Sequence, residues 1–317
     1  MWHTHQTSIR FLAGQRRMGL MLYAAFWITA PWAVFFGIFA YFELFPVFTP
    51  PARKPSSILT PHRRKKVLCT SANCVRCVKN ETLLTHAKEL LEANYTGTSD
   101  YERISNAIER RHEELLLQID FDDSRPIWEL EHFPANFQRD FDMLSLAVEA
   151  VKDDSQKAFD CPSMWSRNGI GENTWFIFPF LNQGIWQDEH CSVCPKIATV
   201  LYRLRNSLTD CVFGNAFISM IPSECAVAEH CGLTNARLRC HLGIEVPNDN
   251  GHCFMQVGGE TFTWTNGACT VIDDSLPHSV SLKGCPEDRT VLVVDFWHPS
   301  LSEKERDCLK RIFSTDG

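Results

Sequence analysis

The hydrophobic and polar residues of this chain follow four successive patterns, and the first is a long uncharged run near the N-terminus. Between Met18 and Phe42 lie 25 residues without a charge. At about 1.5 Å of rise per residue, a helix of this length would cross a hydrocarbon layer about 30 Å thick. The run is longer than the apolar region of a typical signal peptide, and prolines follow it. We therefore expect a tail over residues 1–17 and a retained transmembrane helix over residues 18–45.

The next two patterns are a polar stalk and a helical region. Residues 46–80 are rich in proline, serine and basic residues, which is typical of an irregular linker. From residue 81 to 157, apolar residues recur every three or four positions, as they do on the buried face of a helix. This repeat predicts helices near 83–91, 104–115 and 141–151, and we expect them to pack as a layer on the domain that follows.

The fourth pattern covers residues 158–317, where short apolar and aromatic runs alternate with turn residues. Such runs favour β-strands, and Gly258-Gly259 predicts a tight hairpin between 254–257 and 260–264. Many short strands in succession are typical of a sandwich or jelly roll. The expected fold class is mainly β, with a sandwich or jelly-roll domain, a preceding helical layer and an N-terminal transmembrane helix. The clearest predicted strands are 175–178, 217–221, 238–246, 254–257 and 291–297.

Composition narrows the classes of partner. The chain has 317 residues, of which 44% are hydrophobic, so it can bury a core of ordinary size. Its net charge is -7, and its basic residues form no long run beyond residues 63–66. A nucleic acid is therefore not an expected partner, whereas a membrane is.

The residues give opposite indications about the side of the membrane on which the domain lies. More basic residues follow the uncharged run than precede it, which favours a cytoplasmic C-terminal part. The sequons Asn80-Glu81-Thr82 and Asn94-Tyr95-Thr96 can be glycosylated only in the lumen of the secretory pathway. Both orientations stay open on these residues alone.

Fourteen cysteines suit disulfides, reduced thiols or metal ligands. Cys69, Cys74 and Cys77 have the spacing of the first three ligands of a plant-type iron–sulfur cluster, but no fourth cysteine follows closely. A metal or cluster, disulfides or palmitoylation, and plain thiols all stay open for these residues. Cys191 and Cys194 form a CxxC pair without a partner pair, which gives zinc ligation little support.

Two histidines beside turns are candidate metal ligands. His230 precedes a Gly-Leu-Thr-Asn turn and His278 follows the Asp273-Asp274 turn. A jelly-roll barrel can hold one small ligand inside it, with polar groups projecting from the strand ends. Arg289, near the start of the next predicted strand, is able to clamp a carboxylate in the same cavity. Taken alone, two histidines in a barrel are more simply explained as surface or core residues. Arg289 changes this interpretation, because the three groups together make a candidate metal and carboxylate site.

Five ordered motifs stand out in the second half of the chain, at residues 219–222, 230–235, 237–243, 273–275 and 294–299. Through them the chain resembles the aspartyl/asparaginyl β-hydroxylases, which are iron(II)- and 2-oxoglutarate-dependent oxygenases. With its N-terminal anchor, it is most similar to the membrane-anchored aspartate β-hydroxylase domain-containing proteins of that family.

The resemblance implies a double-stranded β-helix (jelly roll, cupin-like) catalytic domain, and a role for each residue of the site. It implies that His230 and His278 ligate iron, and that Arg239 and His241 are catalytic and bind the end of 2-oxoglutarate that chelates iron. It also implies that five residues, named at the end of this paragraph, line the 2-oxoglutarate pocket. An acidic neighbour of Arg239 is the alternative explanation for that arginine, and a core position is the alternative for the tryptophan of the pocket. The pocket residues are Trp175, Ser219, Arg239, His241 and Arg289.

The residues depart from the usual pattern of such oxygenases at two places. Most non-haem iron oxygenases use two histidines and a carboxylate, but Gly232 stands two positions after His230. Glu229 and Asp273 are the nearby carboxylates that we consider as substitutes. An arginine that the family carries shortly before the pocket tryptophan has no equivalent here except Arg167, at a shifted spacing.

The implied reaction is hydroxylation of a protein side chain, at the β-carbon of Asp or Asn, coupled to decarboxylation of 2-oxoglutarate. The implied protein substrate is an epidermal-growth-factor-like domain, made in the lumen, so we expect a single-pass type II protein of the endoplasmic reticulum with a lumenal, glycosylated C-terminal domain. Two alternatives are a catalytically silent, membrane-anchored binding protein that retains the barrel, and an iron–sulfur or zinc protein centred on Cys69, Cys74 and Cys77.

Overall fold

The computed structural model describes residues 75, 79–95, 99–110, 115–170, 173–248 and 251–315. The predicted transmembrane helix over 18–45 lies outside these residues, as do Cys69, Cys74 and Cys77. None of the helices within these ranges combines the length and the apolar character that a membrane crossing needs.

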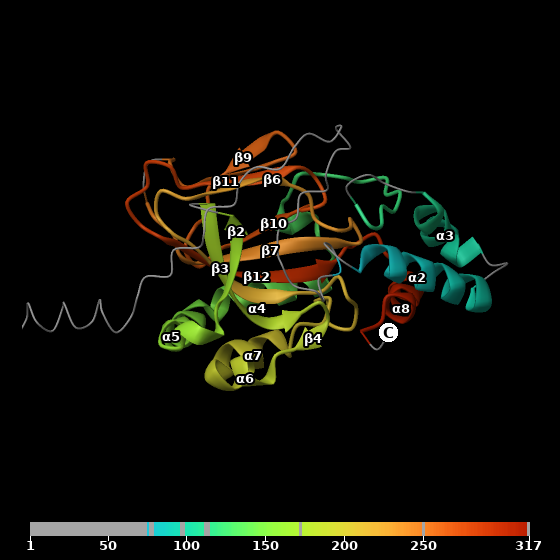
Figure 1. Ribbon diagram of the computed structural model, residues 1–317, viewed down its shortest axis with the longest axis horizontal. Helices are drawn as coiled ribbons and strands as arrows, with labels where there is room; N and C mark the ends of the chain where they lie inside the picture. The colour runs from blue at the N-terminus through green and yellow to red at the C-terminus, as the bar shows by residue number, and fades with distance from the viewer. Residues whose placement is uncertain are drawn as a thin grey trace, which may run out of the picture. The chain divides into compact units, whose positions relative to one another are not determined.

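Antiparallel strands form two sheets, one on each side of a shared core (Figure 1). The smaller sheet has four strands in the order β6 (Ala226–His230), β11 (His278–Ser281), β8 (Phe254–Val257) and β9 (Glu260–Phe262). The larger sheet has eight strands, with β4 (Ile185–Trp186) paired to β3 outside the main order. That order is β1 (Ile127–Trp128), β10 (Cys269–Ile272), β7 (Arg237–Glu245), β12 (Arg289–Trp297), β5 (Ala216–Ile221), β3 (Asn173–Asn182) and β2 (Ser166–Ile170).

Apolar side chains from both sheets meet in one buried cluster. Val227, Met255 and Val280 come from the smaller sheet, and Ile221 and Val291 from the larger one. This packing of one antiparallel sheet on another is the arrangement of a sandwich or jelly roll, so the mainly β prediction is confirmed. The predicted hairpin is also confirmed, because β8 and β9 pair on either side of the two-glycine turn.

Four helices cover the other face of the larger sheet (Figure 1). The helices α4 (Ala135–Leu146) and α5 (Val148–Phe159) replace the single helix predicted near 141–151. The other two, α6 (Asp188–Val193) and α7 (Pro195–Leu201), were not predicted. With six and seven residues, they are too short to show a helical repeat. The buried carboxylate of Asp154 in α5 accepts hydrogen bonds from the first turn of α7 and joins these helices.

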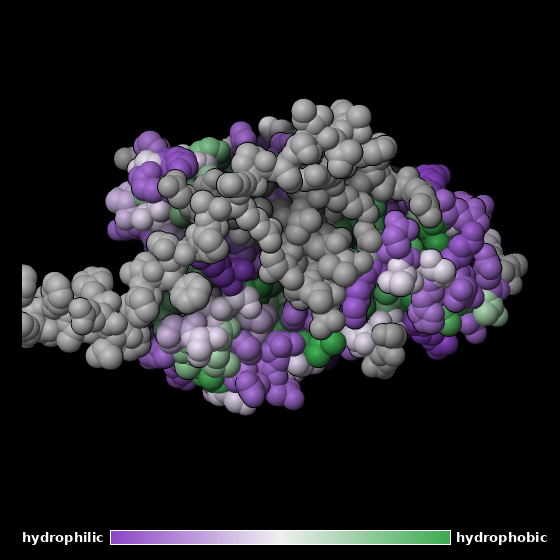
Figure 2. Space-filling model, in the orientation of Figure 1, coloured by the Kyte–Doolittle hydropathy of each residue, from purple (hydrophilic) through white to green (hydrophobic). Residues whose placement is uncertain are grey.

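A second group of helices packs at one end of the sheets. It consists of α2 (Asn80–Asn94), α3 (Glu102–Glu109) and α8 (Glu303–Ile312), and its outer surface is mostly hydrophilic (Figure 2). Arg103 of α3 forms two hydrogen bonds with Glu305 of α8, at 3.0 and 2.8 Å. Three short 3-10 helices complete the described elements: η1 (Ser99–Tyr101), η2 (Leu130–His132) and η3 (Pro162–Met164).

The predicted helix over 104–115 is wrong at its C-terminal end. The helix α3 ends at Glu109, and Leu115 lies beyond it. The next residues, Leu116 and Leu117, instead donate their backbone N–H groups to the carbonyl oxygen of Leu233. Leucines that read as a helical repeat therefore belong to an extended segment packed on the loop after β6.

His298, which belongs to the last of the family motifs, has a structural environment. Its ring stacks on Phe121 at 3.9 Å between ring centroids and meets the edge of Trp128. The Ser300 N–H donates to its Nδ1 at 3.2 Å. Burial lowers the pKa of His298 to about 4, so the folded chain holds this ring neutral at pH values where an exposed histidine is protonated.

This environment predicts a pH dependence of stability. Because the folded-state pKa of His298 lies below the unfolded value of about 6.5, unfolding takes up a proton as pH falls from 6.5 to 4, and the free energy of unfolding decreases in that window. His298→Asn should remove on the order of 2 kcal/mol of this decrease. Urea unfolding of both proteins at pH 7, 5.5 and 4 measures this difference. If the free energy of unfolding falls with pH equally in both proteins, His298 is not the group responsible.

Candidate functional site

The two candidate histidines lie side by side on neighbouring strands of the smaller sheet. His230 is the last residue of β6 and His278 is the first residue of β11, and they are direct partners in the antiparallel register. Their ring centroids are 4.2 Å apart. The strands therefore bring together two imidazoles that are far apart in the sequence, as the sequence analysis expected.

Both histidines are held in the same way by the backbone. The Nδ1 atom of His230 is 2.9 Å from the carbonyl oxygen of Ala228, and Nδ1 of His278 is 2.8 Å from the carbonyl oxygen of Leu276. Because a carbonyl oxygen only accepts, each Nδ1 carries a proton and donates it to the backbone. A hydrogen bond of this kind is typical of histidines that ligate a metal through the other nitrogen.

The carboxylate nearest to Gly232 is neither of the two considered from the sequence. Gly232 donates its N–H to the carbonyl oxygen of Asp274 at 2.5 Å, and a Cβ at position 232 would lie 2.7 Å from the Asp274 carboxylate. Position 232 therefore has no room for an acidic side chain. Asp273 hydrogen-bonds Ser275 instead, and burial raises its pKa to about 6. Glu229 is exposed at the end of β6.

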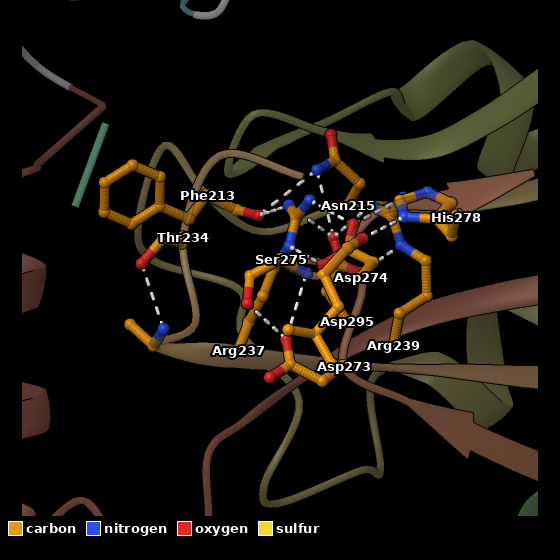
Figure 3. Close-up of polar contacts among 12 residues, drawn as sticks. Phe213, Asn215, Thr234, Arg237, Arg239, Asp273, Asp274, Ser275, His278 and Asp295 are labelled. Carbon is orange, nitrogen blue, oxygen red and sulfur yellow. Dashed lines mark hydrogen bonds and ion pairs between the residues drawn. The ribbon is translucent and has the colours of Figure 1, made fainter. Parts of the chain in front are cut away.

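Asp274 belongs to a buried network of two arginines and two aspartates (Figure 3). Arg237 lies 2.8 Å from Asp274 and 3.0 Å from Asp295, and Arg239 lies 3.0 Å from Asp274 and 2.8 Å from Asp295. Each charge thus contacts both opposite charges. Burial alone would raise the pKa of Asp274, but Arg237 and Arg239 hold that pKa well below its usual range. Arg239 therefore pairs with acidic neighbours, and its expected contact with 2-oxoglutarate stays a prediction.

Arg289 is buried in a different electrostatic environment. It is 2% exposed, and its Nη2 donates to Ser219 at 3.1 Å, as expected for two residues of one pocket. Among the described residues, no carboxylate pairs with it, and its Nε has no hydrogen-bond partner. Burial lowers its pKa to about 10, which leaves it charged at neutral pH. A buried guanidinium without a carboxylate partner is unfavourable unless an anion binds it.

His241 is buried on β7, close enough to Arg289 and His278 for their charges to act on it. Burial lowers its pKa well below the usual value, and the charges of Arg289, Arg239 and His278 lower it further. The Trp264 Nε1–H donates to its Nδ1 at 3.0 Å. These groups therefore belong to one site, and His241 is neutral in it.

The register of β3 places Trp175 on the same side as Ser219. Ile177 pairs with Ser219, and Trp175 lies two residues earlier on the same face of the strand. Trp175 is half-buried against the core between the sheets. Arg167 pairs with Phe176 and donates to Thr174, so it lies on the opposite face and does not replace an arginine of the pocket.

Within the described ranges, no group of three or more histidine, cysteine or acidic side chains is arranged to hold a metal. The candidate metal site therefore has two nitrogen ligands from the protein, one from His230 and one from His278. Cys191 and Cys194 are buried, and the Cys194 thiol donates to the carbonyl oxygen of Asp154 at 3.2 Å. Burial raises the pKa of Cys194 to about 12, which gives zinc ligation at this CxxC pair no support.

Comparison with known proteins decides the family. Residues 140–299 match the family model described as aspartyl/asparaginyl beta-hydroxylase. The chain is 34% identical over 271 residues to human aspartate beta-hydroxylase domain-containing protein 2, which covers 78% of this chain and 71% of that protein. The chain belongs to the aspartyl/asparaginyl β-hydroxylase family.

Two further relatives show how the similarity is distributed. Aspartate beta-hydroxylase domain-containing protein 1 of Mus musculus is 40% identical over 135 residues, covering 42% of this chain and 37% of that protein. Human aspartyl/asparaginyl beta-hydroxylase is 33% identical over 138 residues, which is 44% of this chain but only 18% of that protein. The similarity to human aspartyl/asparaginyl beta-hydroxylase is therefore confined to a limited part of that longer protein.

Reasoning from the sequence missed three residues of the site. Asp274 was named only as part of a turn, Asp295 only within a motif, and Trp264 only at the end of a hairpin. The alternation along β7 was a usable signal, because arginines at 237 and 239 facing into a barrel require buried carboxylates. Nothing in the sequence indicated that Trp264 would contact His241.

The network predicts a large effect from the loss of one charge. Asp295→Asn leaves Arg237 and Arg239 with a single carboxylate between them, and the free energy of unfolding should fall by about 3–5 kcal/mol. Asp153→Asn is the matched control, because Asp153 forms an exposed ion pair with Lys196, and it should have little effect. Urea unfolding at pH 7 measures both, and equal effects would contradict the role given to the network.

Proposed function

We propose that this chain is an iron(II)- and 2-oxoglutarate-dependent dioxygenase that hydroxylates a protein side chain. The observation that supports this most directly is the buried guanidinium of Arg289, which has no carboxylate partner among the described residues. Its position beside Ser219 and near His241 suits one end of a small dicarboxylate.

The site offers donors for both ends of 2-oxoglutarate. Arg289 and the Ser219 hydroxyl would bind the distal carboxylate, deep between the sheets. His241 carries its proton on Nε2, because Nδ1 accepts the Trp264 N–H, and can donate to the other end. Arg239, which is partly exposed, has N–H groups beyond those used for Asp274 and Asp295. Trp175 would limit the pocket on the β3 side.

The histidine pair fits a bound iron(II). The hydrogen bond at Nδ1 of His230 and of His278 orients both rings, so that Nε2 of each ring would be the atom that ligates the metal. When bound, iron(II) supplies the chemistry that couples decarboxylation of 2-oxoglutarate to hydroxylation of a C–H bond. With Gly232 where most such oxygenases carry a carboxylate, the protein would contribute two ligands, and the keto acid would contribute more of the binding.

The buried network has a positioning role in this proposal. Arg237 and Arg239, on β7, hold Asp274 in the turn between β10 and β11, and His278 follows that turn. Asp295, on β12, holds the two arginines from the other side. The network therefore fixes the turn that carries His278 relative to the strands that carry His241 and Arg289.

The substrate and the location are part of the same proposal. The family's description points to aspartyl or asparaginyl side chains, and an epidermal-growth-factor-like domain is the protein substrate that we propose. Such domains are made in the lumen, so we propose a single-pass type II protein of the endoplasmic reticulum, anchored by residues 18–45. The sequon at Asn94 supports this, because Asn94 is exposed at the end of α2.

The function is tested by succinate formation. We expect the full-length chain in detergent, supplied with iron(II), ascorbate and 2-oxoglutarate, to form succinate, and to form more with a disulfide-bonded epidermal-growth-factor-like domain. His278→Ala should abolish this turnover, because it removes one of two protein ligands. Arg289→Met should raise the dissociation constant for 2-oxoglutarate at least tenfold, because it removes the charge that binds the distal carboxylate.

The control is His86→Ala, which removes an exposed histidine of α2 and should leave turnover unchanged. No succinate, with or without a protein substrate, from a protein that binds iron would contradict the proposal. Binding of 2-oxoglutarate without any turnover would instead identify a catalytically silent binding protein that retains the barrel.

The lumenal location is tested by glycosylation. We expect Asn80 or Asn94 to carry a glycan in cells, because a lumenal domain exposes both sequons to the glycosylation machinery. Treatment with an endoglycosidase should increase the gel mobility of the wild-type chain but not that of Asn80→Gln/Asn94→Gln. Equal mobility of the treated and untreated wild type would contradict this orientation.

A further inference from the structure

Trp264 contacts both sides of the proposed co-substrate pocket. Its Nε1–H donates to Nδ1 of His241 at 3.0 Å, and its ring lies 4.5 Å from the guanidinium carbon of Arg289. Trp264 is 5% exposed, so both contacts are shielded from water.

The loop that carries Trp264 is attached to the strand that carries His241. Gly243 of β7 donates to the carbonyl oxygen of Ala268 at 3.1 Å and accepts from Gly267 N–H at 2.9 Å. A Cβ at position 243 would collide with the carbonyl oxygen of Thr265. The glycine thus allows the loop to lie directly against β7, two residues from His241. The position of Trp264 is therefore set by backbone contacts and not by side-chain packing alone.

The hydrogen bond from Trp264 selects one tautomer of His241. An indole N–H can only donate, so Nδ1 must keep its lone pair and the proton must be on Nε2. In the other tautomer, two N–H groups would face each other at Nδ1. His241 can then present only a donor from Nε2, and a donor is what a carboxylate or keto oxygen requires.

The ring of Trp264 acts on Arg289 by a different interaction. A guanidinium over an indole face is attracted by the negative potential of the ring, and this attraction is stronger in a dry site. Arg289 has no carboxylate partner among the described residues, so the tryptophan face stabilises its charge without neutralising it. A carboxylate partner would compete with an incoming anion, whereas an aromatic face does not.

We propose that Trp264 is a positioning residue for 2-oxoglutarate: its N–H fixes His241 as the Nε2–H donor and its ring holds the Arg289 guanidinium uncompensated and ready for a carboxylate. This inference rests on the proposed function for the identity of the ligand. The fixed tautomer of His241 does not depend on that ligand and can be measured separately.

The experiment compares wild type with Trp264→Phe, which removes the N–H donor and keeps an aromatic face. Imidazole ¹⁵N resonances of His241, assigned with His241→Gln, report the tautomer in the full-length chain. We expect a lone-pair Nδ1 and a protonated Nε2 in wild type, and a populated Nδ1–H form in the variant. Calorimetry with 2-oxoglutarate and a redox-inert divalent metal should show a dissociation constant about five- to tenfold higher in the variant.

Trp128→Phe is the matched control. Trp128 is also buried, but its Nε1 has no hydrogen-bond partner among the described residues. It should therefore change neither the His241 resonances nor the affinity for 2-oxoglutarate. A residue with a merely structural role would lower stability without moving the His241 nitrogens, so unfolding is measured for both variants.

Two results would overturn the inference. One is a wild-type His241 with its proton on Nδ1, which is decided without the Trp264→Phe variant. The other is a Trp264→Phe protein whose tautomer or 2-oxoglutarate affinity is unchanged. If the wild type does not bind 2-oxoglutarate at all, both the proposed function and the role of Trp264 toward that ligand are wrong. The nitrogen resonances still show whether Trp264 fixes the tautomer of His241.

Discussion

The cost of removing charge from water is the constraint on which this site depends. Four ionised side chains of the site form a network in which every arginine contacts two aspartates and every aspartate contacts two arginines. Such a network offsets the desolvation of its members and leaves no net charge. Arg289 is the exception, because it contacts a hydroxyl and an aromatic ring and has no carboxylate partner among the described residues. The contrast separates charges that hold the fold from a charge suited to a ligand.

The sequence was sufficient for the longer strands, though not for their order, because side-chain alternation is a local signal. Runs of β-branched and aromatic residues coincide with β3, β5, β7, β8 and β12, and the pairing of β8 with β9 followed from two glycines. The helices were less predictable. The helices α6 and α7 have too few turns to show a period, and the leucines near 115–117 pack on a loop although they are spaced like a helix.

The candidate site was predictable only in part, for physical reasons. His230, His278, Ser219 and Arg289 could be named because their residue types and motifs pointed to one site. The contacts of Asp274 and Trp264 could not, because both arise from loops whose course depends on close approaches at glycines. A glycine in a motif indicates that backbone lies nearby, but not which side chain arrives with it. The pairing of Arg239 with two aspartates likewise required the register of β7 with β12.

The contact between Gly232 and Asp274 also bears on how this site can change. An acidic residue introduced at position 232 would meet a carboxylate that already fills the space, so a single substitution cannot convert the histidine pair into the usual set of two histidines and a carboxylate. Removing Asp274 first would take a partner from both Arg237 and Arg239. Each single-step route therefore passes through a destabilised intermediate sequence. The packing around Gly232 and Asp274 thus keeps the arrangement of two histidines from changing by single substitutions. A protein engineer would have to change at least positions 232 and 274 together.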